Sequence, residues 1–81
     1  MECDMTRLYW DFRGGRAQGT AEHFQRHLDT FLAANDARHE GTGTEAYSPL
    51  HSAAFCDVHS ESRNLLVERL RPHREGAAPS D

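Results

Sequence analysis

Histidine stands out among the residue types of this chain that can carry chemistry. Six histidines occur in 81 residues, and imidazole is both an acid–base group near neutral pH and a common metal ligand. His23 and His27 are four residues apart, a spacing that puts both side chains on one side of a helix. The HExxH signature of zinc proteases is absent, because Phe24 and Gln25 follow His23. We therefore interpret the pair as flanking the apolar face of a helix and predict no metal site.

A second group of potential ligands and nucleophiles comprises His51, Cys56 and His59. Zinc accepts imidazole and thiolate, and a thiolate beside a base can act as a nucleophile. However, strand residues an odd number apart point to opposite faces, which separates Cys56 from both histidines if residues 52–58 form a strand. A cysteine in such a core strand, without a basic neighbour, is expected to be unreactive. We predict no cofactor, no catalytic residue and no enzymatic activity.

One loop has the composition of an anion site. Arg13, Gly14, Gly15 and Arg16 are consecutive; the glycines let the backbone approach a ligand, and two arginines can clamp a phosphate or carboxylate. The longer glycine-rich nucleotide motifs are absent. We keep a small-ligand or anion site at this loop as an alternative to the function given below.

Composition and charge exclude several classes of protein. The formal net charge is −4, whereas nucleic-acid binders usually present a basic face, so we expect no nucleic-acid partner. All nine basic residues are arginine, and lysine and isoleucine are absent, which indicates a GC-rich, bacterial genome. No apolar stretch approaches the ~18 residues of a membrane span, and residues 1–5 do not resemble a signal peptide. We therefore expect a cytoplasmic protein, outside the membrane, with reduced thiols at Cys3 and Cys56.

The chemistry-bearing residues have to be positioned by three short strands. The predicted strands are 7–12, 44–47 and 52–58, with a reversal at 48–51. In the first strand Leu8, Trp10 and Phe12 alternate with polar residues and Tyr9, the pattern of a half-buried strand. Residues 53–56 are apolar on both faces, which predicts a central position for the third strand.

Two helices complete the pattern. The first is predicted at 20–35, where Thr20 is a favourable N-cap. Its apolar stripe comprises Ala21, Phe24, Leu28, Phe31 and Leu32. Residues 36–43 are polar and predict a loop. The second helix is predicted at 60–70, with Ser60 as N-cap and Pro72 closing it.

These elements predict one α+β domain at residues 6–72, between a flexible N-terminus (1–5) and a disordered tail (73–81). The expected fold is a three-stranded antiparallel sheet, in the order first–third–second strand, with two helices on one face. This plan resembles the ferredoxin-like superfold in a shortened βαββα form. That superfold hosts many unrelated functions, so the resemblance implies no activity, and we recognise no specific family.

A missing fourth strand would leave the first strand unpaired. Its edge carries Leu8, Tyr9, Trp10 and Phe12, without the proline or lysine that protects edges. Two copies are therefore expected to join along this edge as a homodimer, unless residues 71–74 fold back and cover it. The opposite sheet face would present an aromatic patch rimmed by arginines, suited to a protein partner; its residues are Arg7, Tyr9, Arg13, Tyr47 and Phe55.

The sequence thus favours a small non-enzymatic α+β protein that acts by self-association or partner binding through an open sheet edge. The anion-binding loop is one alternative, and a metal-binding protein that uses histidines and Cys56 is another. The molecular role does not follow from any of these patterns.

Overall fold

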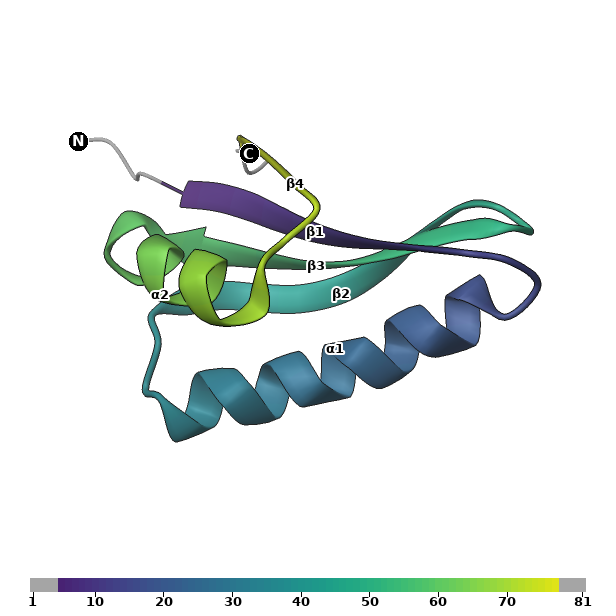
Figure 1. Cartoon of the computed structure of the whole chain (residues 1–81). Helices are drawn as coiled ribbons and strands as arrows, with labels where there is room; N and C mark the ends of the chain where they lie inside the picture. Colours follow the sequence, from purple (N-terminus) through teal and green to yellow (C-terminus); the bar gives the residue numbers. More distant parts are fainter. Residues whose placement is uncertain (1–4, 78–81) are drawn as a thin grey trace.

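A four-stranded antiparallel sheet carries two helices in the computed structural model, which describes residues 5–77 (Figure 1). The elements are β1 (Met5–Arg13), α1 (Ala17–Ala34), β2 (His39–Ser48), β3 (His51–His59), α2 (Ser60–Leu70) and β4 (Arg74–Ala77). The strand order is β2-β3-β1-β4, and all neighbours are antiparallel. The predictions for residues 1–4 and 78–81 lie outside the described residues.

The prediction of a three-stranded sheet is wrong, because β4 pairs with β1. Residues Thr6 to Tyr9 of β1 lie opposite Ala77 to Arg74 of β4. The chain returns to the sheet because Arg71 adopts a left-handed conformation (φ 50°) and Pro72 follows it. The segment predicted to be a disordered tail from residue 73 therefore contains a strand, and half of the edge predicted to be open is covered.

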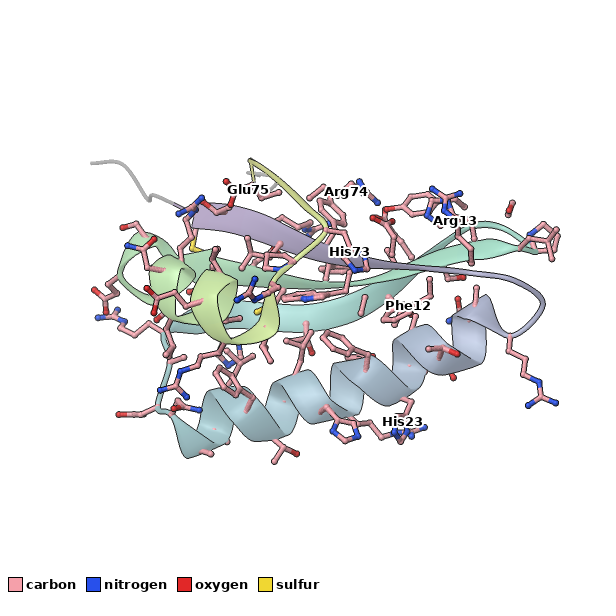
Figure 2. All side chains as sticks on the ribbon, viewed as in Figure 1. Phe12, Arg13, His23, His73, Arg74 and Glu75 are labelled. Atoms are coloured by element: carbon pink, nitrogen blue, oxygen red, sulfur yellow. The ribbon has the colours of Figure 1, made fainter. Side chains whose placement is uncertain are left out.

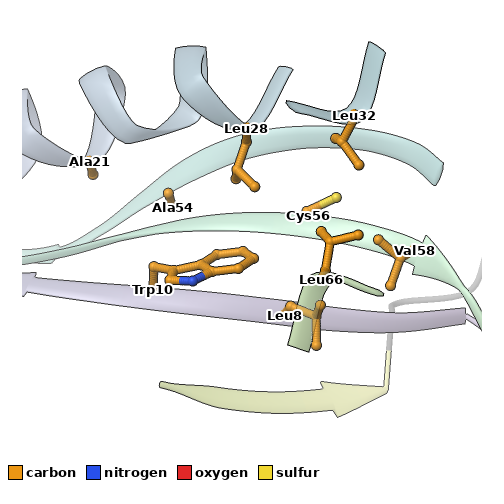
Figure 3. Close-up of a cluster of buried hydrophobic side chains, with 9 residues drawn as sticks. All are labelled: Leu8, Trp10, Ala21, Leu28, Leu32, Ala54, Cys56, Val58 and Leu66. Atoms are coloured by element: carbon orange, nitrogen blue, oxygen red, sulfur yellow. The ribbon is translucent and has the colours of Figure 1, made fainter. Parts of the chain in front are cut away.

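The core lies between the sheet and both helices. Alternate residues of β1 and β3 point toward the helices and are buried, as the period-two pattern predicts. One buried cluster contains side chains from the sheet and from both helices (Figure 3). Its members are Leu8, Trp10, Ala21, Leu28, Leu32, Ala54, Cys56, Val58 and Leu66. Because residues of α1 and of α2 belong to the same cluster, both helices cover the same face of the sheet.

Helix α1 begins three residues earlier than predicted. Arg16, rather than Thr20, occupies the N-cap position, and its side chain makes no capping hydrogen bond. The preceding turn depends on Gly14, whose φ of 110° disfavours other residues. Ala17 and Ala21 are buried at the start of the helix, so small side chains let this end approach the sheet.

Strand β2 is longer than predicted and replaces most of the expected loop at 36–43. Its residues are mostly polar, so the sequence shows no alternation of apolar and polar residues here. Hydrogen bonds between polar side chains connect the strand to α1. Gln25 Nε2 donates a hydrogen bond to Thr42 Oγ1 at 3.1 Å, and Thr42 Oγ1 donates to the Asp29 carboxylate at 2.6 Å. Two bulges interrupt its pairing with β3, at His39/Gly41 and at Ala46/Ser48. Hydrogen bonds rather than apolar burial therefore hold this strand against α1.

Helix α2 has the predicted bounds, with His59 in place of Ser60 at the N-cap. Its C-terminal end is fixed by the core of β1, because Trp10 Nε1 donates a hydrogen bond to the carbonyl oxygen of Leu70 at 2.9 Å. That carbonyl lies in the last turn, where helical partners are missing. The single tryptophan thus ties β1 to the point at which the chain turns toward β4.

Candidate functional site

The sheet face opposite the helices, here called the outer face, carries a connected group of charged and aromatic side chains. It comprises Arg7, Tyr9, Asp11, Tyr47, His51, Ala53, Phe55, Asp57 and Arg74. Ala53 is fully buried although it points away from the helices. The larger side chains of the outer face therefore cover its centre themselves.

At one end of the outer face, Arg7 and Asp57 form a two-point ion pair. The residues are opposite each other on β1 and β3, and Arg7 donates from Nε at 2.6 Å and from Nη2 at 2.9 Å to the two carboxylate oxygens. The hydrogen bond to Asp57 raises the pKa of Arg7 above its ordinary value. The guanidinium also lies 4.0 Å from the centre of the Phe55 ring. Arg7 and Asp57 therefore neutralise each other, and the Arg7 guanidinium also packs on the Phe55 ring.

At the other end, Asp11 is held by the side chains of Arg74 and His51. Arg74 donates to its carboxylate at 2.8 and 2.9 Å, and His51 Nε2 lies 2.9 Å from Oδ1. The hydrogen bond from Arg74, with a smaller effect from His51, lowers the pKa of Asp11 to about 2, although burial opposes the shift. Asp11 is therefore a fixed anion rather than a proton donor, and it lies apart from Asp57, which has its own partner.

Tyr47 extends this cluster from β2. Its hydroxyl donates to Glu45 Oε1 at 3.0 Å and accepts from Arg74 at 2.7 Å, and its ring lies 4.7 Å from that of His51. Arg74 also lies 4.1 Å from the centre of the Tyr9 ring. Burial raises the pKa of Tyr47, which disfavours a phenolate. Arg74 thus joins three strands through one guanidinium.

The residues considered for catalysis are not assembled. Cys56 lies in the core, and burial raises the pKa of its thiol to about 12, so that the thiolate nucleophile is not formed near neutral pH. His51 is on the opposite face, and His59 Nε2 lies 3.1 Å from Glu40 Oε2. Within residues 5–77 no three His, Cys, Asp or Glu side chains converge on one point.

The predicted anion loop lies at the start of α1. Arg13 and Arg16 are exposed, and Figure 2 shows Arg13 and Arg74 on the side of the sheet away from the helices. The Gly14 N–H donates to the Leu50 carbonyl at 2.9 Å, and the Ala17 N–H donates to the Gly14 carbonyl at 3.1 Å. Two of the backbone donors that could face an anion are therefore used to hold the loop.

The residues predicted as an interface are divided among three environments. Leu8 and Trp10 are buried in the core, and Tyr9 lies half-buried on the outer face beneath Arg74. Phe12 is partly buried and its ring lies 5.7 Å from that of Phe24 on α1. Because β4 covers the edge from Thr6 to Tyr9, these side chains do not form one accessible surface.

The longest uncovered edge belongs to β2, where the sequence predicted a loop at 36–43 and a strand only at 44–47. In the described range 5–77, β2 ends the sheet on one side with ten residues, and β4 ends it on the other with four. The outer-face residues that were missed, Arg74 and His51, owe their roles to strand register. Only the assignment of a strand after Pro72 would have brought Arg74 opposite Tyr9.

A scan against protein-family models and searches of curated proteins and of solved structures found no match to this chain. No helix in the described part of the chain is long and apolar enough to cross a membrane.

Proposed function

We propose that this chain is a non-enzymatic association module that pairs with a second copy of itself through the outer edge of β2. The proposal keeps association through a sheet edge but moves it from β1, which β4 partly covers. We also propose that the fold is a complete rather than a shortened ferredoxin-like plan, supported by the β2-β3-β1-β4 order and the two helices in one core.

The observation that carries the proposal is the direction of the backbone groups of β2. Successive strand residues direct these groups to alternate sides. The Tyr9 carbonyl accepts a hydrogen bond from the backbone N–H of His73, just before β4, so the backbone groups of Tyr9 point away from β3. Phe55 is opposite Tyr9 on β3 and therefore directs its own backbone groups away from β1, toward β2. Gly43 lies opposite Phe55 on β2 and returns these bonds. The backbone N–H and C=O groups of Thr42 and Thr44 therefore point out of the sheet. An edge of this kind is a template for another strand.

A two-fold arrangement satisfies these groups without opposing like charges. In an antiparallel pair of β2 strands, residues whose backbone groups point out of the sheet must lie opposite one another. Because every second residue is of this kind, the two residue numbers of each opposing pair add to an even number. Thr42 opposite Thr44 of the second copy meets this condition. The same register places Glu45 opposite Gly41 of the second copy, within the regular part of β2, so its carboxylate does not lie directly across from a like charge.

The state of the outer face supports association rather than catalysis. Its cations and anions are already paired, as Arg7 with Asp57 and Arg74 with Asp11. A chemical site needs groups that are free to bind or to transfer protons. The backbone edge of β2, in contrast, has unsatisfied donors and acceptors in regular order.

A proline substitution tests the proposal. Thr44→Pro removes one outward N–H while leaving the bonds between β2 and β3 in place, and Thr44→Ala serves as the matched control because both variants lose the hydrogen bond from Gln18. Sedimentation equilibrium should show a dimer for the wild type and Thr44→Ala and a monomer for folded Thr44→Pro. Equal dimerisation of the two variants would overturn the β2 edge as the interface.

A further inference from the structure

The side chains of His23 and His27 converge on one point beside α1. Their Nε2 atoms are 3.0 Å apart, and their ring centres are 4.6 Å apart. Both residues are exposed, and Figure 2 shows His23 on the side of α1 away from the sheet. The sequence predicts two histidines on one side of the helix that flank its apolar stripe, and the structure brings their Nε2 atoms within 3.0 Å of each other.

A groove lies next to this pair. A hollow of about 410 Å³ is bounded by both histidines and by aromatic and aliphatic side chains from β1, α1 and the end of α2. The apolar residues that line it are Phe12, Phe24 and Leu70. The histidines therefore stand at an open rim with room for further ligands, rather than inside a closed core.

We propose that His23 and His27 bind one divalent transition-metal ion per chain, with a preference for ions of square-planar or tetragonal geometry. Nε2 atoms 3.0 Å apart, each about 2.0–2.1 Å from a shared ion, subtend about 91–97° at that ion. This is the angle between neighbouring positions of a tetragonal site, and tetrahedral coordination would need the atoms about 3.3–3.4 Å apart. Cu²⁺ and Ni²⁺ favour the former, and Zn²⁺ favours the latter.

A change of tautomer in one ring lets a metal ion replace the hydrogen bond between the two histidines. In the metal-free protein a contact of 3.0 Å between two Nε2 atoms requires one of them to carry a proton and the other to accept it. Metal binding needs both Nε2 lone pairs, so the ring that carries this proton bears it on Nδ1 instead. Water fills the remaining coordination positions, because no third His, Cys, Asp or Glu joins the pair within residues 5–77.

The comparison of Ni²⁺ with Zn²⁺ tests the geometry, because Cu²⁺ exceeds Zn²⁺ at almost any imidazole site. Calorimetric titration of tag-free protein, in a Cys3→Ser background that removes a competing thiol, should show saturation at one Ni²⁺ per chain. Zn²⁺ should bind more weakly. Tighter binding of Zn²⁺, or saturation at half an ion per chain, would overturn the proposal.

Single substitutions assign the ligands. His23→Ala and His27→Ala should each abolish the saturable binding of Ni²⁺ and Cu²⁺, whereas His39→Ala, which removes another exposed histidine, should leave it unchanged. Electron paramagnetic resonance of the Cu²⁺ form should report two imidazole nitrogens in the parent protein, and neither variant should give this two-nitrogen signal. Circular dichroism confirms that the variants are folded. Metal binding that survives both substitutions would contradict the assignment.

Discussion

His73 holds β4 to β1 through its side chain as well as its backbone. Nδ1 of its ring accepts a hydrogen bond from the backbone N–H of Asp11 at 2.8 Å, while its own N–H donates to the Tyr9 carbonyl at 2.8 Å. The ring also lies 6.4 Å from that of Phe12, edge to face. The imidazole thus continues the ladder beyond the point at which the backbone of β4 has turned away.

We expect His73→Ala to loosen β4 and to lower the free energy of unfolding by about 1 kcal/mol, the usual net value of one hydrogen bond. Hydrogen exchange measured by NMR should show that the amide of Asp11 loses protection. His73→Asn is the matched control, because its side-chain oxygen can replace Nδ1 as the acceptor. Unchanged protection of the Asp11 amide in His73→Ala would show that the ring does not hold this edge.

The pair of Asp11 and Arg74 should make stability depend on acid pH. The pKa of Asp11 is about 2 in the folded protein, below its ordinary 3.8. A depressed pKa stabilises the folded state above the unfolded pKa, and this contribution is lost as the pH falls from about 4 to about 2. Because Arg74 is 44% exposed, we expect a contribution of only about 1–2 kcal/mol.

Urea unfolding of the wild type and of Asp11→Asn over this pH range measures that contribution. The wild type should be the more stable protein at pH 6, and the difference should shrink as the pH approaches 2. A difference that is independent of pH would mean that the carboxylate charge does not stabilise the fold.

Phe55 should tolerate no side chain at Gly43. A Cβ atom on Gly43 would lie 2.6 Å from the Phe55 ring, which Arg7 covers from above. We expect Gly43→Ala to lower the midpoint of thermal unfolding, at a cost of roughly 1–3 kcal/mol for an overpacked contact. Gly76→Ala is the matched control, because a Cβ atom there meets nothing within 4 Å. Equal midpoints for the two variants would contradict the contact.

The thiol of Cys56 should be unreactive in the folded protein. Burial raises its pKa to about 12, and the residue is fully buried beneath the helices. In a Cys3→Ser variant, a disulfide reagent at pH 8 should label Cys56 only at the rate of unfolding and immediately in denaturant. Fast labelling without denaturant would place this thiol nearer the surface than the structure does.

The parts of the fold that depend on apolar periodicity were predictable from the sequence. The alternation of Leu8 and Trp10 placed β1, and the apolar run around Cys56 placed β3 at the centre of the sheet. The C-terminal end of α2 also follows from Pro72. These elements form because their side chains are buried, and burial leaves a periodic pattern in the sequence.

The remaining parts depend on contacts that leave no periodic pattern. β2 is held by polar bonds from Thr42 to α1, and β4 is held by backbone pairing and His73. The Arg74 cluster needs the strand register, which is fixed only when β4 is known. Sequence reasoning therefore located the core but assigned the open edge to β1 instead of β2.

Hydrogen exchange of the wild-type protein at two concentrations tests the proposed β2 pairing most directly. At high concentration the amides of Thr42 and Thr44 should be protected by the second copy, and dilution should release them. The amide of Gly43, which faces β3, should stay protected at both concentrations. Fast exchange of Thr42 and Thr44 at every concentration, beside a protected Gly43, would contradict association through this edge.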